Sequence, residues 1–374
     1  MKKYSLIVFI TTLILNLAGF AWPLCDLYAE TVYGFLADIF GFLWSKMPFA
    51  TGEILMYLSV VLLALLIIFC ILLIFLRKQK KYASFTAVYA KSMLCILVTV
   101  LLLYTLNWSL PMRSSVLGEG KFSEREYSLA EYEILRNFVT QNLNEAAGDV
   151  PRDEEGNIIL LDRKEAEEKI AASMNALSAE YPRLKGYYPP MKAALCSDVL
   201  DWMDIGGYTY PYTLEVTCNQ YITDLYYPAL YAHESSHHQG FYRENEANFI
   251  EFLACAKSDD PRIRLAGYLY TYGYVDNAYQ SKLMEVYDKD EAIARYDSQI
   301  KVDPQVGIDQ SYARKLAKAN YDKDQHPLQQ YSETAEKVAD KGWSTQDRIL
   351  QEDNYDGVVP LLLHYFHDNQ IKEF

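Results

Sequence analysis

Two long stretches without charged residues constrain the fold of this chain most. Residues 54–76 form 23 consecutive uncharged, largely apolar positions, and residues 92–110 form 19 more. Each stretch is long enough to cross a hydrocarbon core about 30 Å thick, because a helix rises about 1.5 Å per residue. Both stretches are therefore predicted to be membrane-spanning helices.

A third apolar stretch lies at the N-terminus. Residues 4–22 follow two lysines and have the same apolar character. A cleaved signal peptide is one interpretation, since residues 18–21 offer small side chains near its end. We favour a retained helix, because two further spans follow it. The predicted membrane region thus covers residues 1–110, with three transmembrane helices at about 4–22, 54–76 and 92–110.

The basic residues beside these spans predict how the chain crosses the membrane. Residues 77–91 carry five basic side chains and no acidic one, whereas residues 23–53 carry one lysine and four acidic residues. The positive-inside rule places residues 77–91 in the cytoplasm, and Lys2 and Lys3 agree with a cytoplasmic N-terminus. Three crossings then place residues 111–374 outside. We expect a multi-pass cell-membrane protein, in contact with the lipid bilayer, whose outer domain faces away from the cytoplasm.

Charge disfavours some classes of partner and function. The chain has a formal net charge of −14, and residues 111–374 hold 45 acidic against 27 basic side chains. An outer domain this acidic repels nucleic acid, so no nucleic-acid partner is expected. None of the three spans carries an internal ionisable residue, which the substrate or proton path of a transporter normally requires. A transporter is therefore disfavoured.

The cysteines give little guidance on redox state. Cys70 and Cys95 lie within spans, and Cys196, Cys218 and Cys255 leave an odd number in the outer domain. At most one disulfide can form among those three, and their spacing matches no metal motif. Free thiols are the favoured interpretation.

The pattern after the spans predicts a mainly helical domain. Residues 111–124 contain one proline and two glycines and are predicted to be a linker, so the outer domain covers residues 125–374. Helical periodicity is present at 125–147 and 162–181, whereas residues 213–218 alternate apolar with polar side chains, as a half-buried strand does. The remainder of the chain is typical of helices almost throughout. We expect a mainly α fold with a small β-sheet just upstream of a group of histidines.

That group of histidines forms a metal-binding pattern. His233 and His237 are four residues apart, so they share one face of a helix and both imidazoles can reach a single ion. Glu234 is then placed to hold a metal-bound water and to take its proton. Pro228 suits the first turn of this helix and Gly240 a position just past its end, which predicts a three-turn helix between them.

A third ligand is predicted downstream, because a catalytic zinc ion needs three protein ligands and an open position for water. Glu244 and Glu246 lie in the first turn of a second predicted helix, which Gly240 allows to fold back over the first. Glu244 is the predicted third ligand, because it shares a face with the small Ala247, which lets the two helices approach closely. Glu246 points about 200° away by helical rotation and is the alternative ligand. Asn248 could hydrogen-bond a ligand and fix its orientation.

Other polar residues have two interpretations each. His238 points about 100° away from His237 and is expected to face solvent or to support a ligand rather than to bind metal. His364 and His367 could approach the site as donors to the transition state, but packing and surface roles on a terminal helix are favoured. Glu215 could support a ligand or lie on the polar face of an edge strand. One of the 32 tyrosines could stabilise an oxyanion, and the sequence does not say which.

These motifs resemble those of known zinc peptidases. The Glu-x-x-Ala-Asn segment at 244–248, after a His-Glu-x-x-His helix, is similar to the glutamate-ligand zincins, in which the first glutamate completes the zinc site. The resemblance is closer still to a bacterial membrane-protein family of unknown function within the zincin-like group. That family shares a Pro-Phe-x-x-Gly-Glu segment, found here at 48–53, and a Pro-Phe/Tyr-Thr-x-Glu strand, found at 211–215. The polar residues at 235–238 depart from the apolar residues usual between the histidines.

Together the residues and the resemblance predict a membrane-anchored zinc metallopeptidase with a zincin-like domain. Zinc would be bound by His233, His237 and Glu244, with Glu234 as general base, and the substrate would be a peptide or protein. The alternative is a non-catalytic receptor or scaffold that zinc stabilises. A structural zinc usually fills four positions with Cys or His and has no use for a base, which argues against that alternative.

The expected place for an extended substrate is a sheet edge, by analogy with related zincins and because an added strand binds through its backbone. The strand predicted at 212–218, which includes Thr213 and Glu215, is the candidate for that edge.

Overall fold

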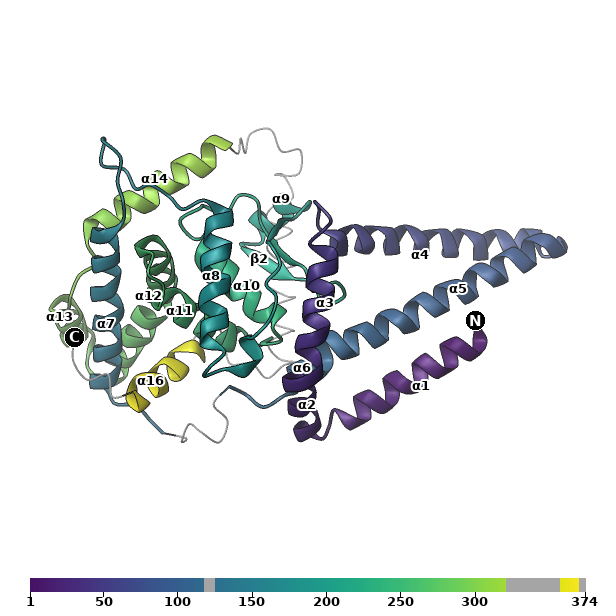
Figure 1. The fold of residues 1–374 in the computed structure, drawn as a ribbon, viewed down its shortest axis with the longest axis horizontal. Helices are drawn as coiled ribbons and strands as arrows, with labels where there is room; N and C mark the ends of the chain where they lie inside the picture. Colours follow the sequence, from purple (N-terminus) through teal and green to yellow (C-terminus); the bar gives the residue numbers. More distant parts are fainter. Residues whose placement is uncertain (118–124, 321–356, 370–374) are drawn as a thin grey trace.

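The computed structural model, which describes residues 1–117, 125–320 and 357–369, has a helical domain from which a group of long helices projects (Figure 1). The projecting helices are α1 (Lys2–Ala18), α4 (Thr51–Leu76) and α5 (Lys80–Tyr104). Helices α4 and α5 meet at the tip farthest from the domain. Most of their large apolar side chains are exposed, because no protein core covers them.

Two of these helices are long and apolar enough to cross a membrane. They are α4 and the continuous helix from Lys80 to Met112, in which a π-helical turn η2 (Thr105–Ser109) and α6 (Leu110–Met112) extend α5. A third candidate joins α1 to residues Trp22–Trp44 across a bend of 114°. The helices predicted at 54–76 and 92–110 are therefore present and fit membrane association. The helix predicted at 4–22 ends earlier, at Ala18.

Three short helices lie between the projecting helices and the domain (Figure 1). They are α2 (Trp22–Tyr28), the π-helical turn η1 (Ala29–Tyr33) and α3 (Gly34–Trp44). The hydroxyl of Tyr33 donates to the backbone oxygen of His238 at 3.0 Å, and the carboxylate of Asp38 accepts from the backbone nitrogen of Tyr187 at 2.6 Å. These contacts join α2, η1 and α3, called the base helices from here on, to the helical domain. The sequence pattern had grouped them with the membrane region at 1–110.

The domain that follows the membrane-helix region is mainly helical, as predicted. Its helices among the described residues are α7 (Leu129–Asp149), α8 (Arg163–Leu177), η3 (Pro182–Leu184), α9 (Ser197–Trp202), α10 (Tyr227–His238), α11 (Glu244–Ala256), α12 (Pro261–Val286), α13 (Lys289–Asp297), α14 (Pro304–Asn320) and α16 (Val358–Asp368). The core lies between α7, α8, α10, α11 and α12, where Leu143, Ile170 and Phe249 have no exposed surface. All six cysteines are free thiols, in agreement with the favoured interpretation.

Local capping explains where two of the predicted helices begin. Ser128 and Glu131 form a capping box at the start of α7, in which each side chain satisfies an orphan backbone group. Asp162 caps α8 by accepting from the backbone nitrogens of the next turn. The helices predicted at 125–147 and 162–181 therefore exist, with ends that differ by a few residues.

A three-stranded sheet with the order β1-β3-β2 lies beside α10. Its strands are β1 (Lys192–Ala193), β2 (Gly207–Thr209) and β3 (Val216–Cys218), and β3 pairs in parallel with β1 and antiparallel with β2. The predicted strand at 212–218 is correct only for its last three residues, because the chain turns at 210–214 and Leu214 has φ of +54°. Both edges of β3 are paired, so the prediction that this strand offers an edge to a peptide is wrong.

The two residues singled out on that strand have structural positions instead. Thr213 is buried in the turn that precedes β3. The buried carboxylate of Glu215 accepts from the backbone nitrogens of Thr51 at 3.0 Å and Gly52 at 2.6 Å, and it pairs with the ammonium of Lys192. Glu215 therefore fastens the start of α4 to the sheet.

Replacing Glu215 should destabilise the protein strongly. Glu215→Gln removes the charge that pairs with Lys192 and leaves that ammonium buried, a change that typically costs about 3–5 kcal/mol. We expect the melting temperature of the purified full-length protein to fall by about 6 °C or more. The control is Glu285→Gln, which removes an exposed ion pair with Lys282 and should shift the melting temperature little. Equal shifts for the two variants would contradict the anchoring role of Glu215.

Candidate metal centre

The helix that carries the His-Glu-x-x-His motif is fully enclosed. Helix α10 runs from Tyr227 to His238, one residue offset from the predicted span, and all twelve of its residues are buried, including both serines between the histidines. It has a proline in its first turn. Gly240 follows with φ of +87°, a left-handed conformation that ends the helix and turns the chain toward α11, as predicted.

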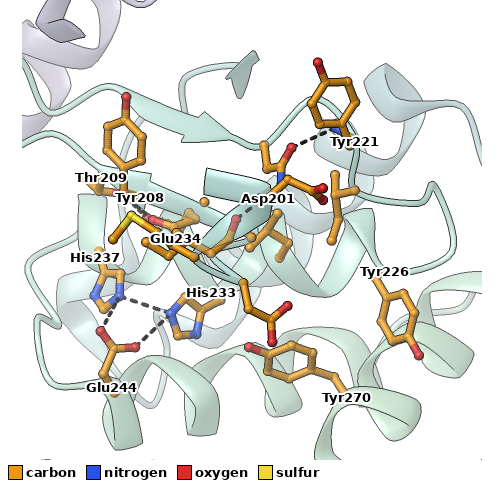
Figure 2. Close-up of a pocket in the computed structure, with 18 of the residues that line it drawn as sticks. Asp201, Tyr208, Thr209, Tyr221, Tyr226, His233, Glu234, His237, Glu244 and Tyr270 are labelled. Atoms are coloured by element: carbon orange, nitrogen blue, oxygen red, sulfur yellow. Dashed lines mark hydrogen bonds and ion pairs between the residues drawn. The ribbon is translucent and has the colours of Figure 1, made fainter. Parts of the chain in front are cut away.

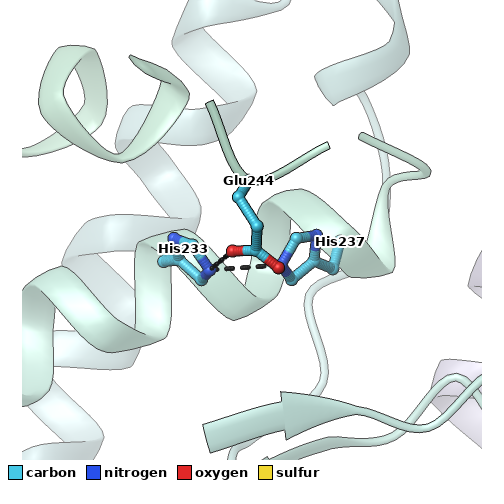
Figure 3. A group of neighbouring side chains, drawn as sticks. All are labelled: His233, His237 and Glu244. Atoms are coloured by element: carbon cyan, nitrogen blue, oxygen red, sulfur yellow. Dashed lines mark hydrogen bonds and ion pairs between the residues drawn. The ribbon is translucent and has the colours of Figure 1, made fainter. Parts of the chain in front are cut away.

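Three predicted ligands meet at one point (Figure 3). The Nε2 atoms of His233 and His237 lie 3.1 Å apart. The carboxylate of Glu244, the first residue of α11, lies 3.2 Å from the His233 Nε2 and 3.6 Å from the His237 Nε2. One ligand atom from each of the three residues lies within 4.8 Å of the other two, which is close enough to hold a metal ion. Among the described residues, this cluster is the group of metal-binding side chains that meets this condition.

The neighbours of His237 fix its orientation. Its Nδ1 lies 2.7 Å from the backbone oxygen of Phe241, which can only accept a hydrogen bond, so Nδ1 carries a proton and Nε2 faces the cluster. Its ring also stacks on Tyr242, with centroids 6.2 Å apart. An imidazole held in this way keeps the tautomer that a metal ligand needs.

Charge within the cluster changes the acidity of its members. Burial alone would lower the pKa of His237, but the Glu244 carboxylate outweighs it and raises that pKa to about 9. Burial likewise opposes ionisation of Glu244, yet the two imidazoles hold the pKa of its carboxyl well below the usual range. In the absence of metal, a protonated His237 thus pairs with an ionised Glu244, and a bound cation would take the place of that proton.

Glu234 lies next to the cluster without belonging to it. Its carboxylate accepts from the Thr209 hydroxyl of β2 at 3.1 Å, and the same hydroxyl contacts the Glu234 backbone oxygen at 2.8 Å. A Cβ added to Gly207 would lie 3.1 Å from the other carboxylate oxygen, so β2 passes directly over this side chain. Burial raises the pKa of Glu234 above its usual value, although the charges of His237 and His233 work in the opposite direction.

A cavity of about 1240 Å³ opens over these residues (Figure 2). His233, Glu234, His237 and Glu244 line it, together with β2 and residues of α12. Among the latter is Tyr270, whose hydroxyl points in Figure 2 toward the side of the cavity where His233 and Glu244 lie. Burial raises the pKa of Tyr270 well above its usual value, so its hydroxyl stays protonated.

The alternative ligand is not at the cluster. Glu246 is buried on a different face of α11, where its carboxylate accepts from the backbone nitrogen of Leu117 at 2.5 Å and pairs with Arg243 at 3.4 Å. The rotation of about 200° relative to Glu244 explains this separation. Asn248 is buried on α11, and no hydrogen bond joins it to His233, His237 or Glu244 in the described part of the chain, so its predicted orienting role is not seen.

The remaining histidines lie away from the cavity. His238 is fully buried rather than facing solvent, because its ring nitrogens contact the backbone oxygens of Leu214 at 2.7 Å and Tyr187 at 3.2 Å. His364 contacts the hydroxyl of Tyr127, and His367 is exposed on α16. Neither lines the cavity, in agreement with the packing and surface roles that the sequence favoured.

Sequence reasoning missed several cavity residues. Gly207 and Thr209 of β2 belong to a segment for which no strand was predicted, because a strand of three residues has no measurable alternation. Tyr270 and Tyr274 were missed as well. Their spacing of four residues places them on one face of α12, and that signal was available in the sequence.

Comparisons with known proteins give one match. The model of a family described as a protein of unknown function, DUF3810, matches residues 28–363. No curated protein and no solved structure matches the chain.

Proposed function

The chain belongs to the DUF3810 family, and we propose that it is a membrane-anchored zinc metallopeptidase whose outer domain faces away from the cytoplasm. One observation carries the proposal: two imidazoles and a carboxylate converge in a cavity that also contains a carboxylate outside the ligand group. A structural metal site has no use for that extra carboxylate, which is Glu234. For that reason we prefer the peptidase to a zinc-stabilised receptor or scaffold.

The donor set of the cluster fits zinc. His233, His237 and Glu244 would hold the ion through two nitrogens and one oxygen, a combination that zinc accepts in hydrolytic sites with one position left open. The ion pair of His237 with Glu244, at 3.6 Å, brings these donors together before any cation arrives. A bound zinc ion would supply Lewis acidity and would make water a stronger nucleophile near neutral pH.

The side chains around the cluster have the chemistry that peptide hydrolysis needs. Glu234 would take a proton from the attacking water and pass it to the leaving amine, and burial moves its pKa toward the neutral range in which such a base works best. The protonated hydroxyl of Tyr270 would donate to the oxyanion that develops on the substrate carbonyl.

A substrate backbone would pair with β2 rather than with the predicted 212–218 segment. In the antiparallel pair, Gly206, Tyr208 and Tyr210 face β3, since Gly206 accepts from Asn219 and Tyr210 donates to Glu215. The backbone groups of Gly207 and Thr209 point the other way, and in the described part of the chain they have no partner. An extended peptide could therefore join this edge directly above Glu234.

Metal analysis of the purified full-length protein tests the proposal. We expect about one zinc ion per chain in the wild type and a large loss in His233→Ala, because that substitution removes one of three ligands. His367→Ala, which changes an exposed histidine on α16, should retain the metal. The proposal fails if the wild type binds no zinc, or if His233→Ala binds it as well as the wild type.

Cysteine labelling tests the proposed topology. Lys80 lies at the tip where α4 and α5 meet, and Lys289 is exposed on α13 of the outer domain. In intact cells an impermeant thiol reagent should label Lys289→Cys strongly and Lys80→Cys only after the membrane is opened, with the wild type as the background for native thiols. Strong labelling at position 80 with none at position 289 would reverse the orientation.

A further inference from the structure

We propose that the substrate of this site is a polypeptide held in the membrane and cleaved within a few residues of the bilayer surface. This inference rests on the peptidase function proposed above and names its substrate class. It follows from where the cavity ends.

The lengths of the two candidate membrane helices estimate where each one meets the bilayer surface nearest the domain. A hydrocarbon core takes about 20 helical residues, and that length counted back from Arg77 along α4 reaches Tyr57. Counted forward from Lys81 along α5, it reaches Leu101, three residues before Tyr104. Tyr57 and Tyr104 are both exposed tyrosines, and such residues prefer the headgroup level of a bilayer.

The cavity of the metal centre extends to that level. Tyr104 and Trp108, at the outer end of the α5 helix, line the same cavity as His233, Glu234 and Glu244. Helix α10, which carries His233 and His237, is close to this end of the span as well. Trp108 packs on Tyr242, whose hydroxyl donates to the backbone oxygen of Asn107 at 2.5 Å and whose ring stacks on His237.

A row of aromatic side chains connects β2 with the membrane helix. Tyr208 contacts Tyr210 with ring centroids 6.2 Å apart, Tyr210 contacts Tyr212 at 5.6 Å, and Tyr212 contacts Tyr104 at 6.4 Å. From Thr209, which contacts Glu234, to Tyr212 is three residues, or no more than about 10 Å of chain. A peptide that lies along β2 would thus pass from the metal centre to the headgroup level in about three or four residues.

One of the base helices, α3, also fits a position at the bilayer surface. On α3 the exposed apolar residues Phe35, Ile39 and Phe42 recur at helical spacing and form one face. The segment that contains α3 bends by 114° from α1, so it runs across the direction in which the membrane helices project (Figure 1). A helix of this kind lies in the membrane interface with its apolar face toward lipid.

The chemistry of the cavity favours a polypeptide over a lipid. Its described lining contains four carboxylates, from Asp201, Asp204, Glu234 and Glu244, and one guanidinium, from Arg314. Even with the two positive charges of a bound zinc ion counted, the lining keeps one net negative charge, so it offers the phosphate of a lipid headgroup little electrostatic attraction. The outward backbone groups of β2, by contrast, match an extended peptide.

Tethered substrates test the inference with the full-length zinc-loaded protein in liposomes. A random-sequence segment is joined to a single membrane-spanning helix through a spacer of about five residues, which reaches at most about 17 Å, or of about thirty residues, which reaches roughly 30 Å. The same segment is also supplied free. Mass spectrometry measures cleavage, and Glu234→Gln provides the background.

We expect the short-spacer substrate to be cleaved at least as fast as the long-spacer one, and both about 10-fold or more faster than the free segment. Cleavage of the long-spacer substrate with the short one resistant would overturn the inference, because it would put the site far above the bilayer. Equal cleavage of free and tethered segments would overturn it too, with the peptidase function intact. Hydrolysis of the liposome lipid, with no peptide cleaved, would identify a lipid substrate instead.

A depth measurement separates the location of the cavity from its chemistry. The native cysteines are first replaced by serine, and a fluorophore is attached at Tyr212→Cys. Nitroxides on lipid headgroups should quench this fluorophore. The same fluorophore at Lys289→Cys should not be quenched. Absence of quenching at position 212 would overturn the membrane-level location whether or not peptides are cleaved. Quenching at 212 with no cleavage of any peptide would reject the peptidase function and, with it, the proposed substrate.

Discussion

Glu234→Gln is expected to keep about one zinc ion per chain while it lowers peptide hydrolysis by about 10²–10⁴-fold, the loss typical of a missing general base. Glu234 is not among the three residues that converge on the metal position, so its replacement removes no ligand. The amide has nearly the same shape and can still accept from the Thr209 hydroxyl, so the fold should persist. Zinc content, melting temperature and peptide turnover, measured on the same preparation, check the three expectations.

The matched control is Glu251→Gln on α11. Glu251 has no exposed surface and does not line the cavity, and burial raises its pKa well above the usual value. Burial thus disfavours its charged form, so a glutamine, which is neutral and has a similar shape, should be tolerated there. We expect unchanged hydrolysis in this variant. If Glu234→Gln retains full hydrolysis, or if both variants lose it equally, Glu234 is not the general base.

The candidate ligands could be predicted from the sequence because they depend on helical geometry alone. Four residues of separation place His233 and His237 on one face of α10, and a glycine with positive φ turns the chain so that Glu244 returns to the same point. The difference between Glu244 and Glu246 follows from two residues of helical rotation. None of these relations needs knowledge of the rest of the fold.

The sheet edge and the extent of the cavity could not be predicted in the same way. Whether β3 is central or peripheral depends on β1, a strand of two residues that pairs with it from 25 positions earlier in the chain (Lys192 with Thr217). The aromatic row from Tyr208 to Tyr104 depends on how the sheet packs against the end of a membrane helix. Local patterning carries no information about such long-range contacts, so the sequence did not reveal that β3 is the central strand.

Two neighbouring carboxylates on α11 provide the strictest test of the ligand assignment. Glu244→Gln replaces a charged donor by a weak neutral one, so zinc affinity should fall by at least about 10²-fold and hydrolysis should fall with it. Glu246→Gln changes the same residue type two positions away, but the Glu246 carboxylate binds the Leu117 backbone and Arg243 rather than the cluster. Its zinc affinity should therefore stay close to that of the wild type, although its melting temperature should drop, since a buried ion pair is lost.

Competition with a chromophoric chelator, well below the melting temperature of either variant, measures both affinities without relying on activity. Loss of zinc in Glu246→Gln together with its retention in Glu244→Gln would move the third ligand to the other glutamate. Equal loss in both would mean that zinc depends on how α11 is anchored to residues near 117 rather than on a specific carboxylate. Only the expected pattern, with affinity lost at 244 and stability lost at 246, fits a cluster in which the first residue of α11 binds the metal and the third holds that helix in place.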